Sequence, residues 1–158
     1  MVTGVPDMSL SRSEMHLLQE STARSICMHG RVEWVSGSKA FGENDSGDRL
    51  DFDWDDGPTP MQVTLQMIGL CSMADVVLGL KERVFDKVWV EMSAERATGT
   101  PRVFTSIHLE YHVRGDVPLK LVERIVKMSH DKYCSVSHMF NEKITITHGS
   151  VLHPLSEA

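Results

Sequence analysis

The sequence has few cysteines, no excess of positive charge and no basic segment followed by an apolar stretch at its start. Its three cysteines, Cys27, Cys71 and Cys134, are too sparse for the disulfide framework of a small secreted protein. The formal net charge of -6 argues against nucleic acid as a partner, because such a partner requires a surface that neutralises phosphates. Since no signal peptide is predicted, we expect a reducing, cytoplasmic location.

The chain also lacks an apolar segment that is free of strongly polar residues. Residues 61–80 come closest, but Gln62, Gln66 and Asp75 interrupt them. An Asp in the middle of a membrane span costs about 2.5–3.5 kcal/mol. The segment therefore predicts a helix buried inside a protein, and we expect no membrane partner.

What remains is the composition of an ordinary globular protein. The 158 residues are 41% hydrophobic and 24% charged, which suits one domain with a substantial core. Residues 1–24 are polar and weakly patterned, so we expect an N-terminal arm followed by a single domain over 25–158. The ten methionines favour an oligomer, because Met suits adaptable interfaces.

Alternating apolar and polar residues predict two groups of strands separated by one long helix. The first group is an antiparallel meander over about 26–35, 39–43 and 50–54. After the helix, the predicted elements are two strands near 88–92 and 107–113, a helix over about 118–128, a short helical piece near 134–141 and a strand near 144–146. The order is βββ-α-ββ-α-α-β, which is typical of an α+β domain.

The long helix leads to a prediction about assembly. Thr59 can cap it, with Pro60 in its first turn and Gln62 reaching back, and it runs to about Lys81. The helix is apolar on nearly every side and should therefore be buried all round. Because one small sheet covers only one side of a helix, we predict an intertwined homodimer with a large apolar interface.

Cys71 and Cys134 are the candidate functional residues. Cys71 lies too far along its helix for the helix dipole to stabilise a thiolate. Asp75, one turn later on the same face, would raise the pKa of the thiol if it were ionised. A free cysteine inside a helix is commonly a small core residue, so a reactive Cys71 needs a nearby cation. Sequence periodicity does not show whether the two thiols meet.

Histidines raise the question of a metal site. His130, Cys134 and His138 would line one face of a continuous helix and could then ligate zinc. No second cluster with metal-site spacing follows, so we expect neither a metal nor a cofactor. His108 and His112 share the polar face of a strand with other charged residues, which predicts a solvated sheet face.

Six segments across about residues 28–150 carry a resemblance to known proteins: 31–34, 58–61, 69–77, 102–109, 132–136 and 144–148. In content and order they resemble the OsmC/Ohr family of proteins that detoxify organic hydroperoxides, and most closely its YhfA-like branch. The resemblance implies an α+β homodimer whose central helices are buried between sheets from both subunits. It also implies a thiol-dependent peroxidase that acts in the oxidative or osmotic stress response.

In this family reading, Cys71 attacks the peroxide and becomes a sulfenic acid. Cys134 then condenses with it to a disulfide, which a dithiol reductant reopens. We expect organic hydroperoxides as substrates, because the residues expected around the site are apolar: Met61, Leu65, Met67, Ile68 and Phe140.

The sequence departs from the better-studied branches at the groups that activate the thiol. Those branches use an Arg from the N-terminal sheet and a Glu just after the helix-opening Pro. Here Met61 and Gln62 follow Pro60, and the candidate cations are Arg31, Lys39 and Arg49. This departure favours an alternative function, a non-catalytic dimeric module that binds an apolar or electrophilic small molecule.

Overall fold

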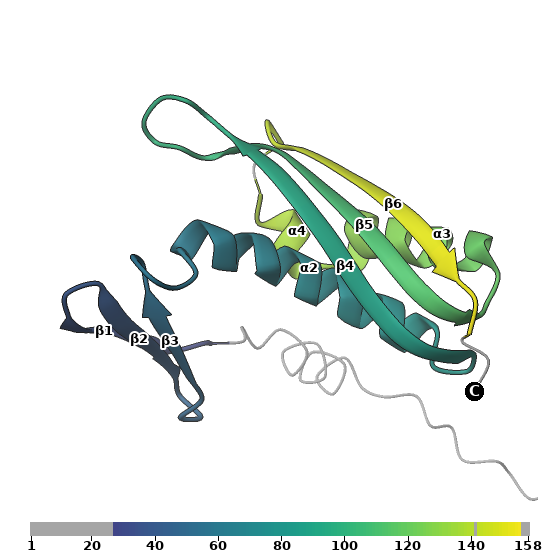
Figure 1. Cartoon of the computed structure of the whole chain (residues 1–158), viewed down its shortest axis with the longest axis horizontal. Coiled ribbons are helices and arrows are strands. Elements are labelled where there is room, and N and C mark those ends of the chain that lie inside the picture. Colours follow the sequence, from purple (N-terminus) through teal and green to yellow (C-terminus); the bar gives the residue numbers. More distant parts are fainter. Residues whose placement is uncertain (1–26, 141, 156–158) are drawn as a thin grey trace, which may run out of the picture. The chain divides into compact units, whose positions relative to one another are not determined.

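A computed structural model describes residues 27–140 and 142–155, which fall into two compact units with their boundary between Asp53 and Trp54. The predicted arm over 1–24 lies outside the described residues, so the expected arm and single domain stay predictions. The predicted order βββ-α-ββ-α-α-β is confirmed, with one short π-helix added before the last helix (Figure 1).

The first unit contains the predicted meander. Its antiparallel strands are β1 (Gly30–Ser36), β2 (Lys39–Asn44) and β3 (Arg49–Asp53). The turn between β1 and β2 depends on Gly37, whose φ of 53° is a conformation that other residues rarely adopt. Val32 and Trp34 are 77% and 66% exposed, so the apolar side chains of β1 are not covered by the described part of the chain.

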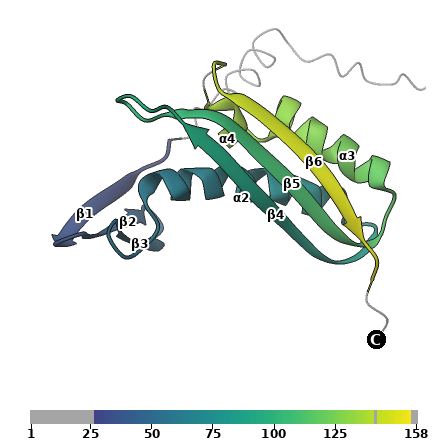
Figure 2. The ribbon, with the colours of Figure 1, turned by 45° about the horizontal axis from the view of Figure 1, so that its top comes forward.

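The second unit packs helices on one face of a three-stranded sheet (Figure 2). Strand β5 lies in the centre, antiparallel to β4 and parallel to β6. The elements are α2 (Pro60–Gly79), β4 (Val84–Arg96), β5 (Phe104–Asp116), α3 (Leu119–Met128), the π-helix η1 (Ser129–Tyr133), α4 (Ser135–His138) and β6 (Thr145–His153). The core of this unit lies between the sheet and the helices.

The two faces of β5 differ as the alternation of its sequence predicts. Leu109, Tyr111 and Val113 face the helices and are fully buried. On the opposite face His108 is exposed, but His112 is only 7% exposed. The prediction of a solvated sheet face is therefore wrong at His112, because neighbouring aromatic side chains cover its ring.

Helix α2 begins as its sequence predicts. The Thr59 N–H donates to Gln62 Oε1 at 2.8 Å, and the Gln62 N–H donates to Thr59 Oγ1 at 3.4 Å, which completes a capping box. These two bonds satisfy backbone donors that the helix itself leaves unpaired.

Among the described residues of one chain, only one face of α2 is buried. Ile68 and Val76 are fully buried against the sheet and the other helices, whereas Leu70 and Leu78 are 53% and 65% exposed. Burial on every side, as expected from the sequence, is therefore not met within one chain. By length and composition alone, α2 could also cross a membrane.

Candidate functional site

The structure brings the two predicted thiols together. Cys71 is half-buried in the middle of α2, and Cys134 is fully buried between η1 and α4, both of which pack on α2. Burial raises the pKa of the Cys134 thiol, the Ser137 hydroxyl and N–H lower it, and the nearby Cys71 thiol raises it. Both cysteines are free thiols, and they lie close enough to affect one another.

A π-helical turn places Cys134. The Cys134 N–H donates to the carbonyl of Ser129 at 2.8 Å, five residues earlier, and the chain then becomes extended. As the N-cap of α4, Cys134 accepts the Ser137 N–H at its Sγ, over 3.4 Å. The helix is not continuous from His130 to His138, so the condition for a zinc site there is not met, and within the described ranges these residues do not group as metal ligands.

A chain of hydrogen bonds links the helix that carries Cys71 with the turn that carries Cys134. The Ser72 hydroxyl donates to the carbonyl of Ile68 at 2.7 Å, and the Tyr111 hydroxyl donates to Ser72 Oγ at 2.5 Å. With its own hydrogen used, Tyr111 accepts from Nε2–H of His130 at 2.8 Å. His130 Nδ1 then accepts from the Ser137 hydroxyl at 2.9 Å.

The electrostatics of this chain keep it neutral. Burial, together with the imidazole of His148 stacked at 5.1 Å, lowers the pKa of His130 to about 4. Burial also raises the pKa of Tyr111 above its usual value. A neutral His130 has one donor and one acceptor nitrogen, which matches the two bonds it makes.

Asp75 in α2 has a hydrogen-bond partner at the start of η1. Its carboxylate accepts a hydrogen bond from the Ser129 hydroxyl at 2.6 Å, which ties α2 to the start of η1. The sequence suggested that Asp75 would disfavour a thiolate at Cys71. In the structure, Asp75 also anchors the turn that carries Cys134.

Two of the three candidate cations for Cys71 have carboxylate partners, whereas Lys39 is an exposed residue of β2. Within the first unit, Arg31 pairs with Glu33, and Arg49 pairs with Asp51 at 2.6 Å. In the second unit Met61 packs against the hydrophobic core, and the side chain of Gln62 closes the helix cap.

Sequence reasoning missed three members of the hydrogen-bonded chain: Ser72, Tyr111 and Ser137. One signal was present, because Tyr111 falls on the inward face of β5 and a buried Tyr hydroxyl usually has a partner. The partners themselves come from helices distant in sequence, so spacing could not identify them.

Comparison with known proteins gives the family of this sequence. The sequence profile of OsmC-like proteins matches residues 53–149. Protein YhfA of Escherichia coli K12 is 39% identical over 127 residues, which cover 77% of this chain and 95% of that protein.

Two solved structures share the fold. A hypothetical protein from Aquifex aeolicus VF5 is 25% identical, with a TM-score of 0.71 over 81% of this chain and 98% of that chain. An organic hydroperoxide resistance protein OsmC from Legionella pneumophila is 14% identical, with a TM-score of 0.57 over 79% and 96% of the two chains. These findings confirm the resemblance. The chain therefore belongs to the OsmC-like protein family.

Proposed function

We propose that this protein is a thiol-dependent peroxidase that reduces organic hydroperoxides with Cys71 and Cys134. The observation that carries the proposal is the contact of the two thiols, which come from elements 63 positions apart and meet in the core of the second unit. The names of several structural relatives, including that from Legionella pneumophila, refer to organic hydroperoxide resistance.

The reaction runs in three balanced steps. The Cys71 thiolate attacks the outer peroxide oxygen of ROOH, the O–O bond breaks, and the alkoxide takes a proton to leave as ROH. The Cys134 thiol then attacks the Cys71 sulfenic acid, which forms the S–S bond and releases water. A dithiol reductant reduces this disulfide, is itself oxidised to a disulfide, and restores both thiols.

The difference in burial between the two cysteines supports these roles. Cys71 is the more accessible thiol and can meet a substrate, whereas Cys134 is 0% exposed and reaches only groups inside the protein. The hydrogen bonds that link Ser72, Tyr111, His130 and Ser137 hold the turn around Cys134 in place. The second thiol therefore stays beside the first.

The test is the consumption of cumene hydroperoxide with a dithiol as reductant. Cys71→Ser should abolish turnover, and Cys134→Ser should allow one rapid equivalent and then stop with a sulfenic acid on Cys71. Cys27→Ser is the matched control, because Cys27 is an exposed thiol in the first unit and should not affect the rate. A wild-type rate in Cys71→Ser would refute the proposal.

The functional form is proposed to be a homodimer. The exposed apolar face of α2, with Leu70 and Leu78, is a surface that a second copy of the chain can cover. Light scattering after size exclusion should give twice the chain mass of 17.7 kDa. A monomer at micromolar concentration would contradict the proposed dimer, but it would not contradict the proposed peroxidase activity.

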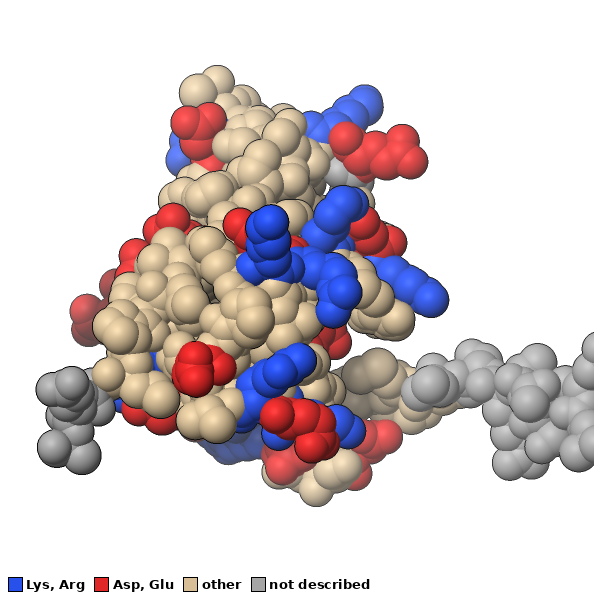
Figure 3. All heavy atoms as spheres, turned by 90° about the vertical axis from the view of Figure 1, so that its right-hand side faces the viewer, with Lys and Arg blue, Asp and Glu red and all other residues tan. Residues whose placement is uncertain are grey.

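The other proposed partners are a small hydroperoxide and a dithiol reductant in a reducing cytoplasm. Figure 3 shows Lys and Arg side chains interspersed with Asp and Glu on the face it displays, where they form no continuous basic surface of the described residues. Together with the net charge of -6, this does not favour nucleic acid as a partner.

A second candidate function rests on the helix cap. Gln62, next to the position where better-studied branches carry the activating Glu, is used to close the cap, and Met61 is packed in the core. A module that binds an apolar or electrophilic molecule needs no activated thiol. A Cys71 thiol that titrates above about 8.5, the value of a free cysteine, would favour this binding function over the peroxidase.

A further inference from the structure

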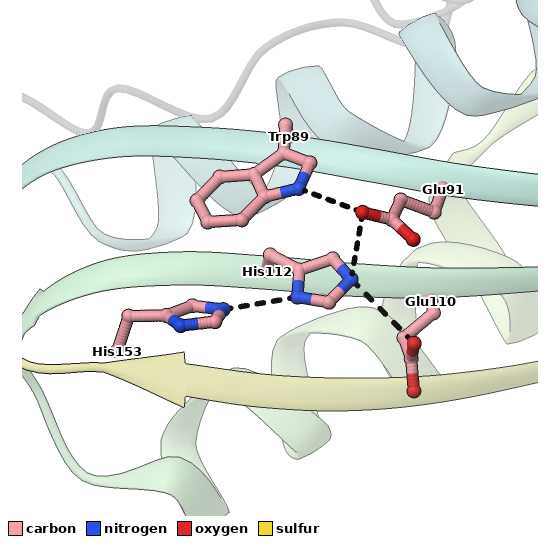
Figure 4. A network of polar contacts seen from close by, with 5 residues as sticks. All are labelled: Trp89, Glu91, Glu110, His112 and His153. Carbon is pink, nitrogen blue, oxygen red and sulfur yellow. Dashed lines mark hydrogen bonds and ion pairs between the residues drawn. The ribbon is translucent and has the colours of Figure 1, made fainter.

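The outer face of the sheet in the second unit carries a cluster of five polar and aromatic residues (Figure 4). They come from all three strands: Trp89 and Glu91 from β4, Glu110 and His112 from β5, and His153 from β6. This face is opposite to the one that packs against the helices and Cys134, so the cluster is separate from the proposed peroxidase site.

His112 is the unusual member of the cluster. It is 7% exposed, and its Nε2 is buried without a hydrogen-bond partner, although it points between the carboxylates of Glu91 and Glu110. Its Nε2 lies 3.5 Å from Glu110 Oε2 and 3.8 Å from Glu91 Oε1. A buried polar nitrogen without a partner costs about 1–3 kcal/mol, so this arrangement points to a missing ligand.

The ring of His112 is held in place from two sides. Its Nδ1 is hydrogen-bonded to Nε2 of His153 at 3.0 Å, and the ring stacks on Trp89 with 4.8 Å between centroids. When Nδ1–H donates to His153, Nε2 of His112 presents a lone pair between the carboxylates. Metal-binding histidines are usually oriented by such a bond from the other ring nitrogen.

Glu91 has a comparable second partner. The indole N–H of Trp89 donates to Glu91 Oε1 at 3.3 Å. This oxygen is the one that approaches His112, so the indole orients it. The cluster therefore contains candidate metal ligands and also the groups that orient these ligands.

The two carboxylates need a positive charge between them. Glu91 and Glu110 are directly paired across β4 and β5, and like charges in that position are destabilising. A divalent ion bound by both would cancel their charges.

The spacing fits a small transition-metal ion. The three candidate ligand atoms all lie within 4.8 Å of one another. Two ligands bound tetrahedrally at about 2.0–2.2 Å from zinc are about 3.3–3.6 Å apart, close to the distances from Nε2 to the two carboxylates. One imidazole and two carboxylates suit zinc and its neighbours better than calcium.

We propose that Glu91, Glu110 and His112 bind one divalent transition-metal ion of the zinc class on the outer face of the sheet. Water completes the coordination, because Glu91 and Glu110 are 67% and 43% exposed and leave that side open. His153 and Trp89 are positioning residues for His112 and Glu91.

The test is zinc binding by the full chain after removal of metal with a chelator, followed by isothermal titration. Because two adjacent thiols can also take zinc, all proteins carry Cys71→Ser. The reference protein should bind one zinc through this cluster. Glu110→Gln and Glu91→Gln should each weaken this binding by at least about 100-fold, and His153→Gln by about 10–100-fold.

Glu95→Gln is the matched control, because Glu95 is an exposed Glu on the same strand outside the cluster. It should bind zinc like the reference protein. The proposal is overturned if the reference protein binds no zinc, if the Glu91 and Glu110 variants keep its affinity, or if the control loses as much as they do. Both Glu residues are exposed enough that their amide variants should fold, and circular dichroism checks this.

Discussion

The substitution Tyr111→Phe removes one hydroxyl from the centre of the hydrogen-bonded chain and leaves the packed ring in place. Tyr111 is 0% exposed, and its hydroxyl donates to Ser72 at 2.5 Å and accepts from His130 at 2.8 Å. Each net hydrogen bond contributes about 1 kcal/mol, and the His130 N–H would be left buried without an acceptor. We therefore expect the free energy of unfolding to fall by about 2–3 kcal/mol.

Urea unfolding at one fixed protein concentration measures this loss, because the stability of an oligomer depends on concentration. The slope of the unfolding free energy with urea should stay unchanged, since the buried area is the same. Tyr133→Phe is the matched control, because Tyr133 is 51% exposed. A loss for Tyr111→Phe below about 0.5 kcal/mol, the size typical of surface substitutions, would show that the chain does not hold the fold together.

Three further predictions concern pH, close packing and the helix cap. Because the pKa of His130 falls from 6.5 to about 4 on folding, the unfolded chain binds a proton that the folded chain does not, so stability should decrease as pH falls through this window. His130→Asn should flatten that decrease in urea unfolding measured at several pH values. Gly115→Ala should cost about 1–3 kcal/mol, because the new Cβ would lie 2.7 Å from the carbonyl oxygen of Val84, whereas Gly99→Ala meets nothing within 4 Å and should be near neutral in thermal melts. Thr59→Ala should cost about 1 kcal/mol through loss of the cap of α2, and Thr59→Ser should restore most of it; equal losses in the two variants would contradict the capping role.

Local signals in the sequence were sufficient for the elements that depend on neighbouring residues. The cap at Thr59 and Gln62 was predictable because a capping box needs only four consecutive residues. The family pattern identified Cys71 and Cys134, but spacing alone could not bring them together, because that contact depends on how α2 packs against η1 and α4.

The cluster around His112 shows why contacts between residues distant in sequence could not be predicted. Glu91 meets Glu110 only through the register of β4 and β5, and a bulge between Glu95 and Arg96 shifts that register near the hairpin turn. Counting residues back from the turn would therefore pair the wrong side chains. His112 had the polar neighbours of a surface residue, while the rings that cover it lie on the adjacent strands.

The π-helical turn before Cys134 makes this part of the chain sensitive to length as well as to residue type. It holds one residue more than an α-helical turn between Ser129 and Cys134. A one-residue deletion there would remove the residue that the wider turn accommodates, and each residue removed from a helix rotates the residues after it by about 100°. Cys134 would turn away from Cys71 although every named side chain was still present. Relatives that lack this extra residue should therefore be expected to place their second thiol differently, or to do without one.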